Sequence, residues 1–598
     1  MDYRRCEYAG ENEIEGEGGG EVIRDFIIIK AVSTIKIGSN YISQKIKITH
    51  CMKIGIFILL TCMMACTSTQ KTTIPAWTPY DETAELAKNA KNENTRLRYK
   101  LIQSKIADKN ELWKNIAGQL KGFTERDYES LKPLILEQDI PTLQMHVQSG
   151  KLSYEKLTQW YLYRIVKFEN DKTKALNNII AINPNAVTEA RKKDRTKNAT
   201  NHPIFGMPIL LKDNINVNGM VTTAGAHVFL TNKTGNAFIT DRLQEKGAII
   251  LGKANLSEWA NYLCLECPNG YSAVGGQTLN PYGRTIFDTG GSSAGSGSAM
   301  AANYAVAAVG SETSGSILSP SSSNSVVGLN PTTGLLSRSG IVPISSTFDT
   351  PGPMTRNVTD NAILLSAMAG EDNADAATKD NPKNKNYEGI FKNGNISGLR
   401  FGVYKAYLRD SLYKASVDRI TSVGGIVVEI EPEAMNMEGF GTILSADMKM
   451  DLPAYIRNHG FVNLPYRTVA DIISFNKKDS LVSIPYGQGR FDDIVKTNIS
   501  PEDFTALKAR MRKAGINYFE KPIEQYQLDF IVSVANRNAG QAAAANYPCL
   551  TVPMGYRKNG EPIGITFIAR PFREDKLLQL GYAFEQATRL RKIPEFYQ

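Results

Sequence analysis

The chain has 598 residues, of which 42% are hydrophobic and 22% charged, and this composition is typical of folded globular proteins. Its formal net charge of +9 is spread over the whole length, without the concentrated lysine and arginine of a nucleic-acid-binding face. Seven cysteines are too few for a disulfide scaffold in a chain of this length. We therefore expect a globular protein with no nucleic-acid partner.

The N-terminal part has the pattern of an export signal that begins inside the chain. Residues 1–51 are mostly polar and show no sustained periodicity, and Met52 then opens an apolar run of about a dozen residues that ends before Cys66. A membrane-spanning helix needs about 20 apolar residues, which favours a cleaved signal peptide. We expect 1–51 to be an upstream extension from a misplaced start codon, 52–65 the signal peptide and 66–80 a polar tether.

The residues around the end of this signal resemble the lipobox of bacterial lipoproteins. They read Met63-Met64-Ala65-Cys66, and in a lipobox the cysteine becomes the lipidated first residue of the mature chain. The resemblance implies a lipoprotein on the periplasmic side of a bacterial membrane. Its contact with the membrane would be limited to the lipid on Cys66.

Helical and strand patterns alternate along the rest of the chain. Residues 81–142 predict a helical extension, and an amphipathic helix over 153–166 follows with Ser153 as its cap. A last helix is predicted over 575–590. Between these helices, short apolar runs predict buried strands over 209–211, 248–251, 400–404, 426–430, 530–534 and 565–569. The alternation predicts an α/β layered fold, and because no repeat or linker divides it, we expect one large domain over 143–598.

The stretch 290–317 has the composition of a nucleophile site. Several serines stand on glycine-containing backbone at both of its ends, and glycine lets backbone N–H groups come close to a substrate. The alanine- and valine-rich middle, 299–309, predicts a buried helix that runs into a strand. A flexible Gly/Ser linker would not carry this apolar middle.

Three other motifs are weaker. Residues 247–254 nearly match a phosphate-binding loop, but alanine stands where a serine or threonine must reach the metal. Residues 291–295 match G-x-S-x-G, the nucleophile elbow of Ser-His hydrolases, for which His459 is the only downstream histidine. Cys264 and Cys267 have metal-ligand spacing but no second pair, so we expect either a local disulfide or two small loop side chains. We expect no metal.

Lys212 is a candidate general base. It follows the apolar run 208–211 and should emerge at the end of a buried strand. Burial disfavours the charged ammonium and can lower the pKa of a lysine from about 10.4 by about 3 to 5 units. Such a lysine can take a proton near neutral pH. The alternative is a strand-end lysine whose ammonium extends to solvent.

Lys212 belongs to a set of motifs that together resemble the amidase signature hydrolases. Their order and spacing carry the resemblance: PILLKDNI, GGQTLNP, GGSSAGS, ETSGSILSP and VVGLNPTTGLLSRSGIVPISSTFDTPGPMTR, at 208–215, 275–281, 290–296, 312–320 and 326–356. The resemblance runs from about residue 143 to the C-terminus and is weakest over 437–529. It implies a mixed β-sheet sandwiched by helices, and the style of the motifs is that of bacterial peptide amidases.

The resemblance also implies a role for each reacting residue. Ser316 becomes the nucleophile, Ser292 a bridging serine that follows a cis peptide bond, and Lys212 the terminal base. The backbone N–H groups that would stabilise the oxyanion are those of Thr313, Ser314, Gly315 and Ser316. Two positions depart from the family pattern, since Ser314 replaces a glycine and Thr289 a proline.

The implied reaction is hydrolysis of a small-molecule or peptide amide through a serine acyl-enzyme, with no cofactor. We expect the residues that select the substrate to lie in 437–529 and in the loop 264–273. Three alternatives stay open: a Ser-His esterase that uses His459, the A subunit of a tRNA-dependent amidotransferase, and a catalytically silent binding protein on the same fold.

Overall fold

The computed structural model describes residues 74–196, 200–382, 387, 389 and 394–598. All of them belong to the larger of the two units into which the chain divides, Lys71–Gln598. The predicted segments 1–51 and 52–65, together with Cys66 and the first half of the tether, lie outside the described residues. Within the described part, no helix combines the length and the apolar character needed to cross a membrane.

A single mixed sheet forms the centre of this unit. In the described residues it contains eleven strands in the order β1-β3-β2-β6-β8-β7-β12-β13-β11-β9-β10. The group β3, β2 and β6 is parallel, as is the group β11, β9 and β10, and the strands between them are antiparallel. The bounds are β1 Ile179–Ile182, β2 Pro208–Lys212, β3 Ile249–Ala254, β6 Ala307–Glu312, β7 Val327–Asn330, β8 Thr350–Thr355, β9 Arg400–Tyr404, β10 Ile426–Ile430, β11 Phe530–Val534, β12 Cys549–Tyr556 and β13 Pro562–Ile568.

The α/β fold predicted from the sequence is confirmed, and so is every one of the six predicted strands. The runs at 400–404, 426–430 and 530–534 coincide with β9, β10 and β11, and the other three overlap β2, β3 and β13. Residues 247–254, the near match to a phosphate-binding loop, contain β3 and are buried between its two neighbours in the sheet.

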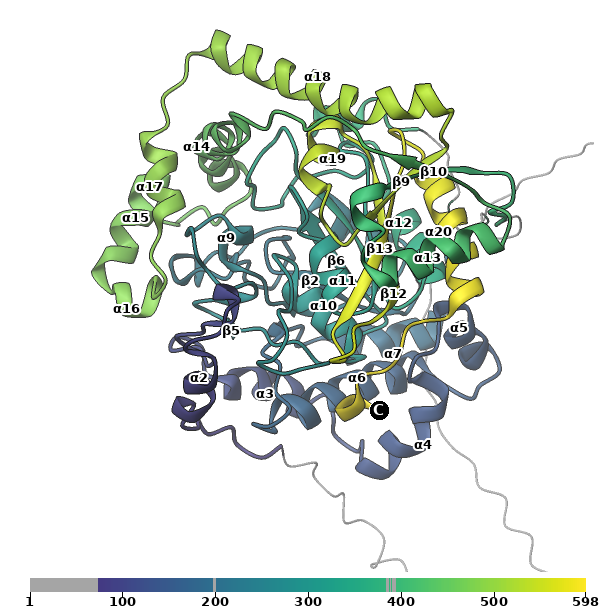
Figure 1. Ribbon diagram of the computed structural model, residues 1–598. Coiled ribbons are helices and arrows are strands. Elements are labelled where there is room, and N and C mark those ends of the chain that lie inside the picture. The colour runs from purple at the N-terminus through teal and green to yellow at the C-terminus, as the bar shows by residue number, and fades with distance from the viewer. Residues whose placement is uncertain (1–73, 197–199, 383–386, 388, 390–393) are drawn as a thin grey trace, which may run out of the picture. The chain divides into compact units, whose positions relative to one another are not determined.

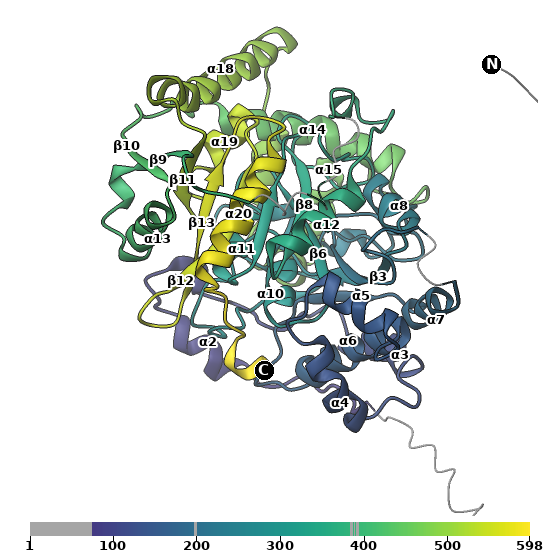
Figure 2. The ribbon, with the colours of Figure 1, turned by 90° about the vertical axis from the view of Figure 1, so that its right-hand side faces the viewer.

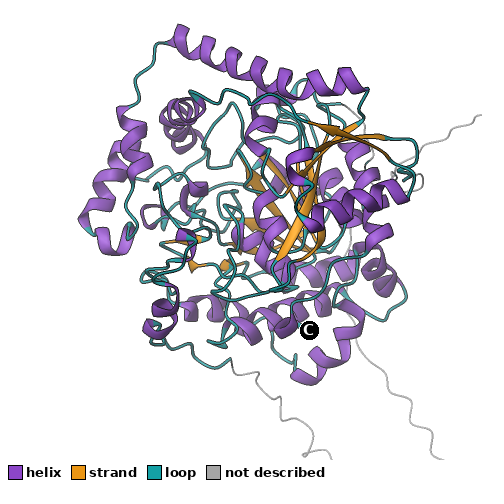
Figure 3. Cartoon of the chain, in the orientation of Figure 1, coloured by secondary structure: helices purple, strands orange, loops and turns teal. Residues whose placement is uncertain are grey.

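Helices cover both faces of the sheet (Figure 1; Figure 3). Two of them, α10 (Ala294–Ala301) and α11 (Leu318–Ser323), lie on one face, against β6, β7, β12 and β13. The opposite face carries α12 (Val358–Met368), α13 (Ser411–Ser422) and α20 (Glu574–Thr588), which stand in front of the strands in Figure 2. The predicted last helix over 575–590 corresponds to α20.

The predicted helical extension is also present. Its members are α2 Thr83–Asn89, α3 Lys109–Ala117, α4 Glu125–Ile135 and α5 Ile140–Gln148, followed by α6 Tyr154–Glu169 and α7 Ala186–Thr196. The Ser153 side chain accepts the Lys156 N–H and caps α6, as predicted. Arg164 of α6 is fully buried and donates to the carbonyls of Ala302 and Tyr597, so it joins this layer to the C-terminal end of the chain.

The region of weakest resemblance forms a separate group of helices with its own buried apolar cluster. It contains α14 Phe440–Asn458, α15 Val469–Lys478, α16 Ser480–Ser483, α17 Gly489–Lys496 and α18 Pro501–Tyr526, and α19 Ala539–Ala545 packs on the last of them. In Figure 1 these helices form the green upper and left-hand part of the unit. Two short strands, β4 (Tyr271–Ser272) and β5 (Gly276–Gln277), form a small hairpin outside the main sheet.

The order of strands explains how distant motifs meet. β2 and β6 are adjacent and parallel, so the residues that follow them emerge at the same edge of the sheet. At this edge β2 ends with Lys212, and β6 ends with Glu312, where the next loop begins. The stretch 290–317 folds as predicted, with the buried helix α10 leading into the buried strand β6.

Candidate active site

Lys212 ends β2 in a position without solvent contact. Its side chain has 0% exposure, and its Nζ atom lies 2.7 Å from Ser292 Oγ, 3.0 Å from the Ser311 carbonyl oxygen and 3.0 Å from Ser311 Oγ. Burial lowers the pKa of Lys212 to about 7, although the carboxylates of Asp349 and Glu312 oppose this shift. A substantial fraction of Lys212 is therefore neutral at neutral pH.

The three contacts of Lys212 determine where its lone pair points when it is neutral. A neutral amine has two hydrogens and one lone pair, and the Ser311 carbonyl can only accept a hydrogen bond. Asn214 Nδ2 also donates to Ser311 Oγ, at 2.9 Å, so this hydroxyl oxygen serves as an acceptor. When both amine hydrogens are donated to Ser311, the lone pair faces the hydroxyl of Ser292.

Ser292 stands between β6 and the start of α10. The peptide bond between Gly291 and Ser292 is cis, in agreement with the resemblance. Ser292 is fully buried, and its carbonyl oxygen accepts the N–H of Ser257 at 3.0 Å. Gly290 has a φ of +67°, and a Cβ atom there would lie 2.7 Å from the backbone of Pro320. Only glycine fits this turn without strain.

Ser316 lies on the loop between β6 and α11 and is partly exposed. The Ser316 carbonyl accepts the N–H of Ser293 at 3.1 Å, which places the loop beside the residue that follows Ser292. Among the described residues, the Ser316 hydroxyl makes no hydrogen bond. The structure therefore joins Lys212 and Ser292 directly and leaves the Ser316 Oγ accessible next to them.

Glu312 organises the same loop. Its carboxylate accepts the N–H groups of Gly315 at 2.6 Å, Ile317 at 2.6 Å and Leu318 at 3.0 Å. The Gly315 N–H is thus already donated in this arrangement, whereas within the described chain those of Ser314 and Ser316 have no acceptor. Of the four oxyanion donors that the resemblance implied, Ser314 and Ser316 are available to a substrate here.

Thr313 and Gly315 fix the shape of the loop. The Thr313 hydroxyl donates to Asp349 at 2.5 Å, and Gly315 has a φ of +97° with the Asn536 side chain close to where a Cβ would stand. Ser314, which replaces a family glycine, points its hydroxyl toward Gly540, where an added Cβ would lie 3.6 Å away. The extra side chain is therefore accommodated by a glycine on α19.

The residues of the Ser-His alternative are not arranged as a pair. Ser293, the central serine of the elbow motif, is fully buried, and its hydroxyl donates to the Ser311 carbonyl at 3.1 Å and accepts the Ser311 N–H at 3.2 Å. His459 follows α14, and its ring makes no hydrogen bond to a serine in the described part of the chain. Ser293 therefore anchors α10 to β6.

The other two motifs have structural partners. Cys264 and Cys267 form a disulfide, so the first of the two expectations for this pair holds. Lys253, in the near match to a phosphate-binding loop, is buried and lies 3.0 Å from the Asp213 carboxylate. No group of three His, Cys, Asp or Glu side chains with metal-binding geometry occurs in the residues that the structure describes.

Three residues of the site were not predicted. Ser311 binds Lys212, Asn214 holds Ser311, and Glu312 holds the nucleophile loop. Ser311 and Glu312 stand inside or next to the ETSGS motif, so the motif was a signal for them. Their contacts depend on the pairing of β2 with β6, which the sequence pattern did not predict.

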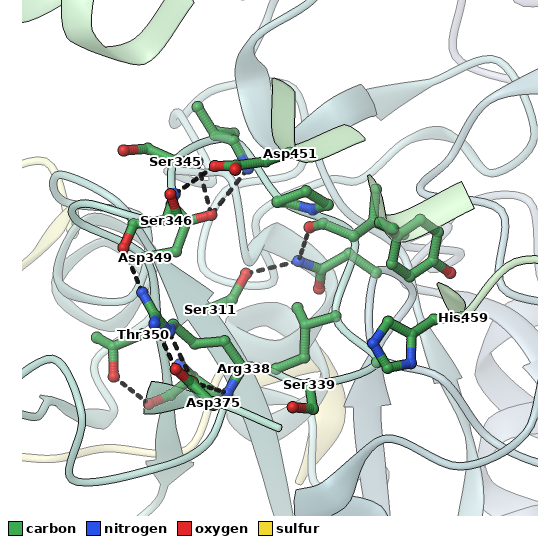
Figure 4. Close-up of a pocket in the computed structure, with 18 of the residues that line it drawn as sticks. Ser311, Arg338, Ser339, Ser345, Ser346, Asp349, Thr350, Asp375, Asp451 and His459 are labelled. Carbon is green, nitrogen blue, oxygen red and sulfur yellow. Dashed lines mark hydrogen bonds and ion pairs between the residues drawn. The ribbon is translucent and has the colours of Figure 1, made fainter. Parts of the chain in front are cut away.

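A cavity of about 240 Å³ lies beside these residues (Figure 4). Ser311 and Thr313 form one part of its wall, and the loop 338–351 forms another. The far side comes from α14 and the residue that follows it, through Asp451, Ala454, Tyr455, Asn458 and His459. The predicted specificity region 437–529 therefore supplies one wall of the cavity. Ala260 also lines it, but no residue of the loop 264–273 does.

A serine on a glycine-containing loop, a second serine and a buried lysine of lowered pKa are the parts of a serine–lysine hydrolase. The chain belongs to the amidase family. The family model described as Amidase matches residues 156–437. The protein is accordingly an enzyme that hydrolyses amide bonds, as the motifs implied.

Individual relatives support this assignment. A "probable amidase" of Arabidopsis thaliana is 36% identical over 482 residues, which cover 77% of this chain and 92% of that protein. The solved structure of a peptide amidase from Stenotrophomonas maltophilia is 36% identical, with a TM-score of 0.73 over 77% of this chain and 99% of that one. A glutamyl-tRNA(Gln) amidotransferase polypeptide of Levilactobacillus brevis, the A subunit of that enzyme, is 29% identical over 75% of this chain and 96% of that protein.

Proposed function

We propose that this amidase hydrolyses its substrate through an acyl-enzyme on Ser316, with Ser292 and Lys212 as the proton relay. The observation that carries the proposal is the 2.7 Å hydrogen bond between Lys212 Nζ and Ser292 Oγ, made by a lysine without solvent contact. The partly exposed Ser316 hydroxyl beside this pair supplies the nucleophile. The physiological substrate is a small-molecule or peptide amide.

In the first step, neutral Lys212 takes the proton of Ser292, and Ser292 takes the proton of Ser316. The Ser316 oxygen then attacks the amide carbon, and the carbonyl electrons move to oxygen as a tetrahedral oxyanion forms. The N–H groups of Ser314 and Ser316 donate to this oxyanion, and each donor of this kind is worth about 3 to 4 kcal/mol.

In the second step the oxyanion collapses and the C–N bond breaks. Ser292 gives its proton to the departing nitrogen and recovers one from protonated Lys212, so ammonia leaves when the amide is primary. Water then attacks the ester on Ser316, its proton passes along the same relay to Lys212, and a carboxylic acid is released.

Ammonia release from a panel of primary amides tests this mechanism. We expect turnover by the mature chain and its loss, by a factor of about 10³ or more, in Ser316→Ala and Lys212→Ala. Ser319→Ala is a matched control, because Ser319 is a partly exposed serine three residues further along the chain with no contact to Lys212. Unchanged turnover in Ser316→Ala would rule out this nucleophile.

The A subunit of a tRNA-dependent amidotransferase is the second candidate, since such a polypeptide is among the relatives. The higher identity to a peptide amidase, 36% against 29%, favours a free amidase. The two differ in what they need: a free amidase releases ammonia alone, whereas the amidotransferase polypeptide passes it to a partner. Full ammonia release by the purified single chain distinguishes them.

We also propose that the protein is exported and anchored by a lipid on Cys66. The lipobox-like residues before Cys66 support this location. Mass spectrometry of the native N-terminus tests it: a lipidated Cys66 as the first residue is expected. Peptides from residues 1–51 in the native protein would contradict the proposal.

A further inference from the structure

The cavity of Figure 4 lies against the proposed proton relay. Its wall includes Ser311, which binds Lys212, and Thr313, which precedes Ser316 on the nucleophile loop. It also includes Ala260, three residues after Ser257, whose N–H is donated to the Ser292 carbonyl. A substrate whose amide reaches Ser316 therefore has room for a further group here.

The charged side chains of the cavity do not balance. Asp349, Asp375 and Asp451 face a single arginine, Arg338. Figure 4 shows this arginine beside Asp375, to which its Nε and NH2 atoms donate at 2.8 and 2.5 Å, while its NH1 donates to the Ser346 carbonyl. In the described part of the chain, Asp349 and Asp451 have no ion-pair partner.

Backbone groups hold these two carboxylates but carry no net charge. Asp349 accepts the N–H groups of Ile344 at 2.8 Å and Ser345 at 2.9 Å, and Asp451 accepts that of Ser346 at 2.7 Å. His459 adds no positive charge at neutral pH, because burial lowers the pKa of its ring. The cavity is therefore negative.

Asn214 adds an unused acceptor. It lines the cavity and is 2% exposed, and its Oδ1 atom has no hydrogen-bond partner among the described residues. The Val342 carbonyl accepts from Asn214 Nδ2 at 3.4 Å, so an exchange of the two amide atoms would place two oxygens together. A buried acceptor without a donor is costly, and a ligand that brings N–H groups would remove this cost.

The rest of the lining is aliphatic. It consists of Ile341, Val342, Pro343, Ile344, Pro351, Ala260, Ala374 and Ala454. Such a wall suits a hydrocarbon chain, and the carboxylates and the free acceptor suit a cation at the end of it.

We propose that this cavity is the specificity subsite of the enzyme and that it takes an aliphatic chain ending in a primary ammonium group. The inference rests on the proposed function and names its substrate class: amides that carry such a chain on either side of the scissile bond. Asp451, on α14, is the principal specificity-determining residue, since its charge is unpaired and it belongs to the divergent region.

Binding of a small cation tests the subsite without any turnover. Calorimetry with n-pentylammonium should give a dissociation constant at least tenfold lower than with 1-pentanol. Asp451→Asn keeps an acceptor for the Ser346 N–H but loses the charge, and should reduce the affinity for the cation at least fivefold. Ala454→Lys, which adds a competing ammonium three residues along α14, should have the same effect.

Asp418→Asn is the matched control, because Asp418 is an exposed carboxylate on α13 that pairs with Lys414 outside the cavity. It should bind both compounds as the wild type does. Equal binding of pentylammonium and pentanol, or an Asp451→Asn variant with wild-type affinity for the cation, would overturn the inference even if the enzyme is an amidase.

Turnover then shows on which side of the amide the cation lies. One series holds ω-ammonioalkanamides and the other N-(ω-ammonioalkyl)acetamides, each with two to six methylenes and each compared with its uncharged methyl analogue. We expect kcat/KM at least tenfold higher for the cation in one series, and a smaller ratio in Asp451→Asn. Hydrolysis of the neutral amides without a preference for either cation would refute the subsite and leave the amidase mechanism standing.

Discussion

Lys212 is an effective base in this arrangement because its burial and its hydrogen bonds act together. Burial lowers its pKa to about 7, and the two acceptors of Ser311 direct its lone pair to Ser292. The sequence was sufficient to find Lys212, Ser292 and Ser316, since each stands in a recognisable motif. It was not sufficient to find Asn214 and Ser311 as their supports, because that contact joins residues 97 positions apart.

The pH dependence of turnover follows from the lysine. Neutral Lys212 is the reactive form, so kcat/KM should rise with pH up to about 7 and then level off. Below that pH it should fall about tenfold per unit, since one proton is bound. Asp349 and Glu312 face the lysine and would raise its apparent pKa while they are charged. A pH–rate profile that is flat between pH 5 and 7 would contradict the assignment.

Ser311 should act on turnover through the position of Lys212. Ser311→Ala removes one hydrogen bond to the amine, worth about 1 kcal/mol, so kcat should fall by roughly a factor of ten. KM should change little, because Lys212 reacts and does not hold the substrate. Ser311→Thr retains the hydroxyl and should restore most of kcat. Steady-state kinetics of both variants checks this, and a loss confined to KM would argue against positioning.

The secondary-structure elements were predictable to different degrees. The apolar runs of β9, β10 and β11 gave correct bounds because a strand that packs on both faces is apolar throughout. β8 was missed because its sequence, TPGPMT, holds two prolines and a glycine, and these residues normally interrupt strands. Tertiary pairing with β6 and β7 overrides that preference.

The buried Arg164 of α6 should contribute strongly to stability. Its three donors bind the Ala302 carbonyl at 2.9 Å, the Tyr128 hydroxyl at 2.6 Å and the Tyr597 carbonyl. Arg164→Met keeps much of the volume but leaves these acceptors unpaired, at a cost of about 2 to 4 kcal/mol in total. The thermal unfolding midpoint should fall by several degrees. A midpoint within 1 °C of wild type, roughly the effect of a neutral surface change, would contradict this role.

Two carboxyl groups at the contact of α12 with α20 should make stability depend on pH. Burial raises the pKa of Asp360 to about 7 and that of Glu585 to about 8, although Arg356 and Arg591 oppose the shifts. The unfolded chain releases these protons near pH 4, so the folded state binds more protons between about pH 4 and 8. The free energy of unfolding should therefore fall as the pH rises through this range.

Glu585→Gln tests this contribution, because glutamine can still accept the Val358 N–H but cannot ionise. Thermal unfolding from pH 5 to 9 should show a smaller decline in the variant than in the wild type. Equal slopes for the two proteins would mean that Glu585 does not carry the effect.

At the scale of the whole molecule, the sheet and the divergent helices have separate tasks. Parallel pairing of β2 with β6 brings Lys212 beside the nucleophile loop, and α14 closes the cavity next to it. The family motifs predicted the chemistry because they lie around the sheet. They did not predict the cavity, because its outer wall comes from 437–529, where the resemblance is weakest, and a wall is set by packing and not by a motif.

Covalent labelling of Ser316 tests the central proposal most directly. The mature chain is treated with a fluorophosphonate, which reacts with activated serines, and the modified peptide is identified by mass spectrometry. We predict one label, on Ser316, that disappears in Ser316→Ala and is strongly slowed in Lys212→Ala. A label on another serine, or a folded wild-type chain that takes up none, would contradict the proposal.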